Sequence, residues 1–98
     1  MSTVKYIQLS TLCTHYKIEM SFFDGLDEQG IIEFVTIEND TCIPEEKIET
    51  LEKIIRLNQE LEINFAGIDT ILNLLEKVEE LNDELRITKA RLNFYEEK

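Results

Sequence analysis

The sequence predicts a mainly α-helical protein, a winged helix-turn-helix with a small β-hairpin wing and a long C-terminal coiled-coil helix. Two short stretches within the first thirty residues carry apolar side chains at helical spacing. A run rich in β-branched residues then encloses a polar turn, which is typical of a hairpin. From Ile71 to Tyr95, mostly apolar side chains recur at steps of three and four residues, which is typical of a coiled coil.

The first half opens with a short extended piece around Ile7, followed by two predicted helices. Ser10 is the expected N-cap of the first helix, which ends at Lys17. The second helix is expected over Glu19–Gln29, and Gly30 follows it as a C-cap residue. A tight link between the two helices predicts the helix-turn-helix shape.

The predicted wing is a hairpin whose two strands enclose a turn with Asn and Asp. Its first strand is expected over Ile31–Ile37, its turn over Glu38–Asp40 and its second strand over Thr41–Ile43. Pro44 suits the first turn of the following helix, because an N–H group in that position has no helical partner. That helix is expected to extend to about Glu62.

The last helix carries the longest apolar pattern of the chain and is expected to start near Phe65, with Asn64 as its N-cap. Its apolar positions form an a/d seam with a period of 3.5 residues. At 1.5 Å per residue, about 32 residues span roughly 48 Å, which is more than the rest of so small a protein can cover. We therefore expect the helix to dimerise, most simply as an antiparallel homodimer, or to bind a partner. The expected dimer residues are Val78, Leu81, Leu85, Leu92 and Tyr95.

The expected organisation is a winged helix-turn-helix over residues 1–64 and a dimerisation or partner-binding helix over residues 65–98, which together form one compact unit. Ninety-eight residues provide a core of modest size. Ile68, Leu72 and Leu75 widen the apolar surface at the start of the last helix. We expect this end to be packed and the other end to project.

The composition indicates the cellular compartment of the protein and the kinds of partner that its charge would attract. The net charge of −11 and the pI near 4.4 disfavour attraction to DNA, RNA or anionic lipid, whereas a basic protein surface would be attracted. Cys13 and Cys42 lack the spacing of a metal site, so we expect buried or half-buried thiols and no disulfide. No signal peptide and no apolar run of 18 residues is present, so we expect a cytoplasmic protein without a membrane span.

No catalytic residue, metal site or cofactor is expected, and the protein is predicted not to be an enzyme. His15 is the only histidine and has no convincing acid–base partner at helical spacing. Lys77 and Arg86 are interleaved with the carboxylates of Glu76–Glu84, which indicates a solvated face and not a metal cluster. The three glycines are scattered and form no phosphate-binding loop.

The charge pattern of this chain does not suit DNA binding. Between residues 1 and 45, eight acidic side chains stand against Lys5 and Lys17, which gives a net charge of −6. A helix that reads a DNA groove presents Arg, Lys, Asn or Gln to the bases and basic side chains to the phosphates. The expected recognition helix has no Lys or Arg and contains Glu19, Asp24, Asp27 and Glu28. The fold class is shared with DNA-binding proteins, but this surface does not suit DNA.

The sequence around the start of the last helix resembles that of the CbpM family, chaperone-modulatory proteins with a MerR-like fold. The resemblance extends over nearly the whole chain and is strongest over Arg56–Leu75. Phe65 stands where a tryptophan is usual and Ala66 where a proline is usual. Phenylalanine keeps an aromatic side chain there and alanine keeps the helix. The positions that fit the family pattern are Arg56, Leu57, Glu60, Leu61, Gly67 and Ile68.

The resemblance implies that the chain binds the J-domain of a DnaJ/CbpA-type co-chaperone and inhibits its stimulation of a DnaK-type chaperone. J-domains present a basic helix to DnaK, and an acidic protein can compete for that surface. The resemblance does not specify the carboxylates that make this contact. Charge placement favours the long helix, so the candidate partner-binding residues are Asp69, Glu76, Glu79, Glu80, Asp83 and Glu84.

Two other functions remain open on the sequence. The chain could be a MerR-type transcriptional regulator that binds DNA as a dimer, or a structural adaptor for an unrelated basic partner. A regulator of that type senses through a further effector region, and no obvious room for one follows the predicted coiled coil. A neighbouring gene for a J-domain protein would favour the chaperone-modulatory function.

Overall fold

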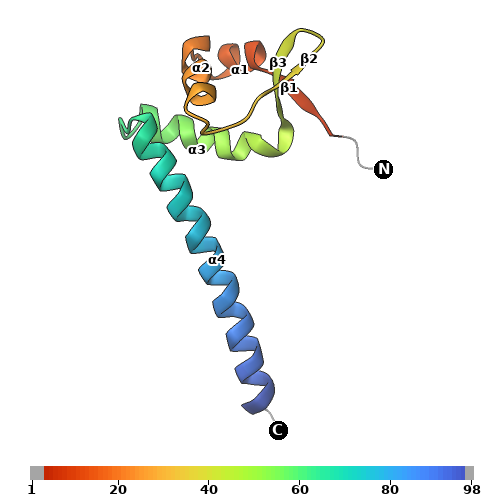
Figure 1. Ribbon diagram of the computed structural model, residues 1–98, viewed down its shortest axis with the longest axis vertical. Coiled ribbons are helices and arrows are strands. Elements are labelled where there is room, and N and C mark those ends of the chain that lie inside the picture. Colours follow the sequence, from red (N-terminus) through yellow and green to blue (C-terminus); the bar gives the residue numbers. More distant parts are fainter. Residues whose placement is uncertain (1–3, 97–98) are drawn as a thin grey trace. The chain divides into compact units, whose positions relative to one another are not determined.

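The computed structural model describes residues 4–96 and confirms the predicted fold class, a mainly helical chain with a small antiparallel sheet (Figure 1). The first three residues of the predicted first domain and the last two of the predicted second domain lie outside the described range. The elements are β1 (Tyr6–Gln8), α1 (Leu9–Tyr16), α2 (Met20–Glu28), β2 (Val35–Ile37), β3 (Asp40–Pro44), the 3-10 turn η1 (Glu45–Lys47), α3 (Ile48–Gln59) and α4 (Phe65–Glu96).

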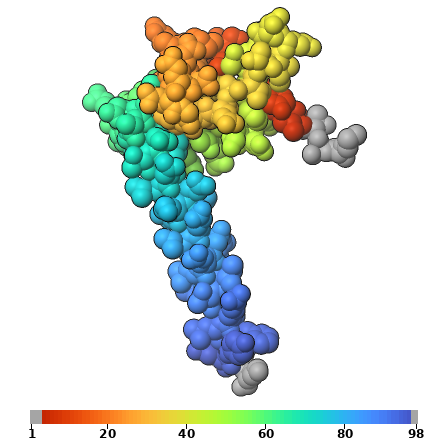
Figure 2. Space-filling model, in the orientation of Figure 1, coloured from red at the N-terminus to blue at the C-terminus, as the bar shows by residue number. Residues whose placement is uncertain are grey.

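The chain divides into two compact units, the first ending at Ile68 and the second beginning at Asp69. Helix α4 therefore starts inside the first unit, and from Asp69 onward it forms the whole described part of the second. Figure 2 shows the residues of this second unit in blue-green to blue.

Helices α1 and α2 form the predicted helix-turn-helix. Each helix buries one apolar side, represented by Leu12 in α1 and Leu26 in α2. The turn between them is tight, because Lys17 adopts a left-handed conformation with a φ of 57°. This places the N–H of Ile18 3.0 Å from the carbonyl oxygen of Cys13, which it donates to. The turn thus closes the end of α1 and redirects the chain into α2.

The prediction that Ser10 caps α1 was wrong. The helix starts at Leu9, and its N-cap is Gln8, whose side chain makes no capping hydrogen bond. Gln8 is also the last residue of β1, where it pairs with Cys42. Sheet pairing and the burial of Leu9 set the helix start in place of a local side-chain cap.

The wing is a hairpin of β2 and β3, and β1 adds a third strand, so that β3 lies in the centre of the sheet. Both neighbours run antiparallel to β3, with Ile7 of β1 opposite Ile43. The loop between β2 and β3 has two residues, Glu38 and Asn39, with φ values of 50° and 69°. Two consecutive positive φ values are typical of the type I′ turn, whose twist matches that of the strands it joins.

The first strand of the hairpin is shorter than the predicted span. Strand β2 begins at Val35, because the apolar residues before it cover the core instead of joining the sheet. Ile32 is buried, and the Phe34 ring meets the Phe23 ring edge-on at a centroid distance of 6.1 Å. The β-branched run therefore combines a core-packing segment with a strand of three residues.

Pro44 ends strand β3 and is not in the first turn of a helix, contrary to the prediction. It lies opposite Tyr6 in the sheet, and its backbone is extended. The N–H of Glu45 then donates to the carbonyl oxygen of Lys5 at 2.8 Å, which carries the pairing one residue further. Only after the 3-10 turn does α3 begin, at Ile48. Pairing with β1 thus overrides the helical preference of the Pro-Glu-Glu sequence.

The core of the first unit is apolar, and no buried polar or charged residue is found within residues 4–96. Fully burying a side chain of the size of leucine or phenylalanine contributes about 1.5–3 kcal/mol relative to leaving it exposed. Four helices, the central strand and the connecting residues Ile18 and Ile32 supply the interior. The largest fully buried side chains are Phe23, Leu26, Ile43, Leu51, Ile54 and Ile68.

The junction between α3 and α4 confirms the predicted start of the long helix. Helix α3 ends at Gln59, three residues before the expected end, and Glu62 turns the chain with a φ of 54°. Asn64 caps α4 as predicted, because its Oδ1 accepts a hydrogen bond from the N–H of Gly67 at 2.9 Å.

Phe65, the first residue of α4, anchors the start of this helix against α2. Its ring lies 5.6 Å from the ring of Phe22, measured between centroids. Gly25 of α2 leaves the space for this approach, because a Cβ atom added there would stand only 2.5 Å from Cε2 of Phe65. The glycine that weakens the helical pattern of α2 therefore allows the aromatic contact between the two helices.

Candidate protein-binding surfaces

The five residues of the predicted dimer seam are exposed on α4. Their exposed fractions range from 50% for Val78 to 68% for Tyr95. The predicted packing of the helix start holds for the buried Ile68, but Leu74 and Leu75 are already exposed. Apolar side chains that follow one another along a helix form the kind of surface that marks interaction sites. Coverage of this seam by a second copy stays a prediction.

The six candidate partner-binding carboxylates form a row on the side of α4 that faces away from the seam. All six side chains are exposed. At 3.6 residues per turn they fall within an arc of roughly 140°, with Glu84 at the edge nearest the seam. A second chain can therefore cover the seam while the row stays open to another protein. The row consists of Asp69, Glu76, Glu79, Glu80, Asp83 and Glu84.

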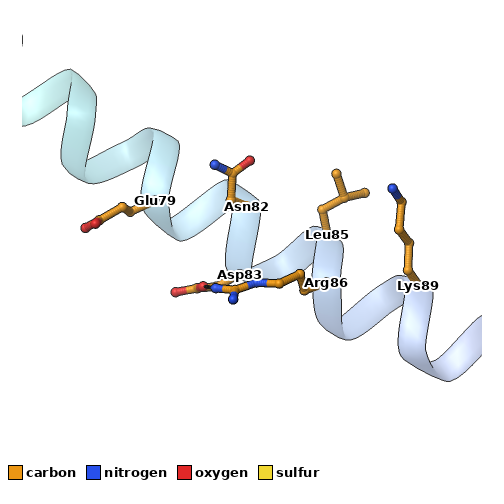
Figure 3. Close-up of a pocket in the computed structure, with 6 residues that line it drawn as sticks. All are labelled: Glu79, Asn82, Asp83, Leu85, Arg86 and Lys89. Atoms are coloured by element: carbon orange, nitrogen blue, oxygen red, sulfur yellow. Dashed lines mark hydrogen bonds and ion pairs between the residues drawn. The ribbon is translucent and has the colours of Figure 1, made fainter.

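Figure 3 shows the two sides of α4 in the region where the row ends. Leu85 of the seam and Lys89 extend in one direction, whereas Glu79 and Asp83 extend in another. Asp83 forms an ion pair with Arg86, one turn further along, so its charge is partly balanced. The shallow pocket that these six labelled residues line is formed by a single helix and cannot enclose a small molecule. The surface suits contact with a macromolecule.

The acidic row has an apolar continuation along α4 that was not predicted from the sequence. Alternating steps of four and three residues connect Glu76, Glu80, Asp83, Ile87, Ala90 and Phe94, a set that we call the outer stripe. The stripe changes from acidic to apolar after Asp83, and the exposed fractions of Ile87 and Phe94 are 53% and 67%. The signal in the sequence is the spacing of residues 87, 90 and 94. It overlaps with the stronger seam pattern in the same segment.

Helix α2 presents an acidic surface. Asp24, Asp27 and Glu28 are exposed along the helix, and Met20 is the exposed apolar residue at its start. The wing does not reverse this charge, because its hairpin carries Glu38 and Asp40 and no Lys or Arg. The Gln8 amide donates a hydrogen bond to the Asp40 carboxylate at 3.0 Å. The recognition helix thus offers no cationic side chain for a phosphate.

A small groove lies between α1 and α3 in the first unit. It is lined by Tyr16, Glu52, Ile55, Arg56, Gln59 and Glu60. The Tyr16 hydroxyl donates to the Glu52 carboxylate at 3.0 Å and connects the two helices. Burial raises the pKa of Tyr16, and the hydrogen bond and the charge of Glu52 raise it further. The phenol therefore stays protonated at neutral pH, as its donor role requires.

The two thiols are half-buried or buried, as the sequence predicts. Cys13 is half-buried and Cys42 is buried, and both are free. Burial raises the pKa of the Cys13 thiol, which favours the unreactive protonated form. His15 is exposed, and its ring meets the Tyr16 ring edge-on at 4.7 Å.

Within residues 4–96, neither a metal site nor a membrane-spanning helix is found. No group of three or more His, Cys, Asp or Glu side chains in that range could hold a metal ion. No helix in the same range combines the length and the apolar character that crossing a membrane requires.

Comparison with known proteins gives a match at the level of the family. A sequence model described as MerR HTH family regulatory protein matches residues 7–90. The matched range takes in the helix-turn-helix, the wing, α3 and most of α4. No curated protein and no solved structure matches the chain.

Proposed function

Because the chain belongs to the family of MerR helix-turn-helix regulatory proteins, we propose that it is a non-enzymatic, cytoplasmic member whose partner is a protein and not DNA. The proposed partner is the J-domain of a DnaJ/CbpA-type co-chaperone, whose stimulation of a DnaK-type chaperone the protein inhibits. The observation that carries the proposal is the charge of α2, which has three exposed acidic side chains and no Lys or Arg. Such a helix repels phosphates and attracts a basic protein surface.

The acidic row on α4 supplies the surface for this partner. Complementary charges speed the encounter of two proteins and suppress wrong partners, and a J-domain presents a basic helix. The net charge of −11 extends this attraction beyond the contact itself. The resemblance of Arg56–Leu75 to the chaperone-modulatory proteins supports a J-domain as the source of the basic helix.

The proposed assembly is an antiparallel homodimer formed through the seam of α4. If the two helices cross between Leu81 and Leu85, each Leu81 lies against Leu85 of the other copy. The acidic first half of each helix then runs beside the half that carries Arg86, Lys89 and Arg91. The distribution of charge along α4 therefore supports the antiparallel arrangement.

The test is calorimetric titration of the J-domain into wild-type protein and into a variant with Glu76, Glu79, Glu80 and Asp83 all changed to Lys. Wild-type binding should weaken as salt rises, because the Debye length shortens to about 8 Å at 0.15 M ionic strength. The variant should bind more weakly and should no longer suppress J-domain-stimulated ATP hydrolysis. Its fold should persist, because these side chains are exposed and lie away from the seam.

A matched control carries the same change of charge on the first unit, with Glu33, Glu46, Glu49 and Glu60 changed to Lys. All four are exposed, so the control separates the effect of total charge from that of position. Retention of most of the affinity by the control supports the α4 row. Full binding by a well-folded α4 variant would show that another face makes the contact, with Asp24–Glu28 of α2 as the next to test.

A second candidate is a MerR-type transcriptional regulator that binds DNA as a dimer. The family match favours it, because the matched range includes both helices of the helix-turn-helix and the wing. The two candidates need surfaces of opposite charge on α2, so DNA binding and J-domain binding discriminate between them directly. The acidic α2 is the reason for placing the regulator second.

A further inference from the structure

We infer that Ile87 and Phe94 form an apolar anchor at one end of the partner-binding face of α4, so that the partner is a basic helix with an apolar end. This inference rests on the proposed function and adds to it the second half of the binding surface. The outer stripe is continuous from Glu76 to Phe94, so one straight partner helix can contact both its acidic and its apolar part.

The apolar part of the outer stripe faces away from the dimer seam. Phe94 and Leu92 are two positions apart, and residues two apart on a helix do not share a face. Dimerisation through the seam therefore leaves Ile87 and the outer side of Phe94 uncovered by the partner copy's helix, while the Phe94 ring meets the ring of Tyr95, a seam residue, edge-on at 5.5 Å. The side chains of Ile87 and Phe94 are both more than half exposed. Exposed aliphatic and aromatic side chains at this spacing indicate a contact surface for a partner other than the second copy.

Charge along the stripe determines the chemistry and the direction of that occupant. Glu76 and Glu80 at one end attract basic side chains, whereas Arg86, which pairs with Asp83, and Arg91 stand beside the apolar end. The partner helix therefore places its basic segment against residues 76–83 and its apolar segment against residues 87–94. From Glu76 to Phe94 the stripe is roughly 27 Å long at 1.5 Å per residue, a length that suits a partner helix of five turns.

The two halves of the stripe act on different steps of binding. Carboxylates at an exposed rim mainly raise the association rate, because they steer the encounter. Buried aromatic and aliphatic anchors mainly slow dissociation, because their contacts must be lost before the complex separates. The acidic half is therefore expected to determine how fast the partner arrives, and the apolar half how long it stays.

The test measures association and dissociation rates of an immobilised J-domain with the full-length protein and its variants. Changing Ile87 and Phe94 to Gln removes the apolar anchor but preserves the helix, because glutamine is a good helix former. This change should raise the dissociation rate roughly tenfold to a hundredfold. The association rate should change by less than about twofold. Ala90→Glu, which places a charge inside the anchor, should have the same direction of effect. Phe94→Leu, which keeps an apolar side chain, should retain most of the wild-type residence time.

The matched control is Leu61→Gln, because Leu61 is an equally exposed apolar residue, at 62%, that lies outside α4. It should leave both rates unchanged, and all variants should sediment as the wild type does. If the wild type binds and the Ile87/Phe94 variant dissociates at the same rate, the inference is overturned and the proposed function stands. Failure of the wild type to bind the J-domain overturns both.

Discussion

At the scale of single residues, the contact between Gly25 and Phe65 connects the recognition helix to the start of α4. Glycine inside a helix normally costs about 0.5–1 kcal/mol relative to alanine, because it loses more backbone entropy on folding. Here the absent side chain provides the space that the Phe65 ring occupies. Gly25 therefore lowers the helix stability of α2 but permits aromatic packing between two helices that are distant in sequence.

Gly25→Ala should accordingly destabilise the protein, although the same change in most helices is stabilising. The added Cβ would stand 2.5 Å from the Phe65 ring, and overpacking of this kind typically costs about 1–3 kcal/mol. We expect a net loss of about 1 kcal/mol in the free energy of unfolding, measured by urea denaturation. In a Phe65→Leu background the loss should disappear, since the clashing ring is gone.

Ser21→Ala is the control for this prediction, because Ser21 is an exposed position of the same helix. It should raise stability slightly through helix propensity alone. A Gly25→Ala protein as stable as the control would show that the Phe65 ring moves aside without cost.

At the scale of elements, α4 carries two exposed surfaces, the seam on one side and the outer stripe on the other, for which we propose separate roles. A change on one side should leave the other intact. Changing Leu81 and Leu85 to Lys should produce monomers or aggregates, because two cations would enter the seam and an apolar contact would be lost. Sedimentation at micromolar concentration measures the outcome.

The control for the seam places the same two lysines on the opposite side, at Glu79 and Asp83. That variant should sediment as a dimer. A wild-type protein that sediments as a monomer at micromolar concentration would refute the seam as a dimer contact.

The sequence predicted those elements whose determinants are local. Asn64 and the start of α4 follow from a cap and a period that lie within a few residues of each other. The strand ends were wrong where they depend on distant pairing, as for Pro44, which β1 holds in the sheet. Ile87 and Phe94 were missed for a different reason. Two periodic patterns share one helix, and the one with more apolar members hides the other.

At the scale of the whole molecule, the net charge of −11 opposes attraction to the phosphates of DNA. Binding to DNA draws most of its affinity from Lys and Arg contacts with phosphates. We expect no sequence-specific binding at physiological salt, measured by fluorescence anisotropy with fragments from the region upstream of its own gene. Selective, tight binding to such a fragment would favour the transcriptional regulator over the chaperone modulator.

A gain-of-charge variant makes this prediction sharper. Changing Asp24, Asp27 and Glu28 to Lys converts the exposed side of α2 from acidic to basic without touching its buried residues. The variant should acquire weak, salt-sensitive DNA binding that lacks sequence preference. This result would show that the helix-turn-helix can approach DNA and that charge alone keeps the natural protein away.

Because a long stretch of α4 packs against nothing within its own chain, we expect the helix content of the protein to depend on the protein concentration. Isolated helices in water are only marginally stable, since packing supplies most of their free energy. From Leu74 to Glu96 the side chains of α4 are exposed, and the proposed association through the seam would supply that packing. Anything that binds only the folded form stabilises it by mass action. Far-UV circular dichroism should therefore lose helical signal on dilution, and the second half of α4 should be the first part cut by a protease.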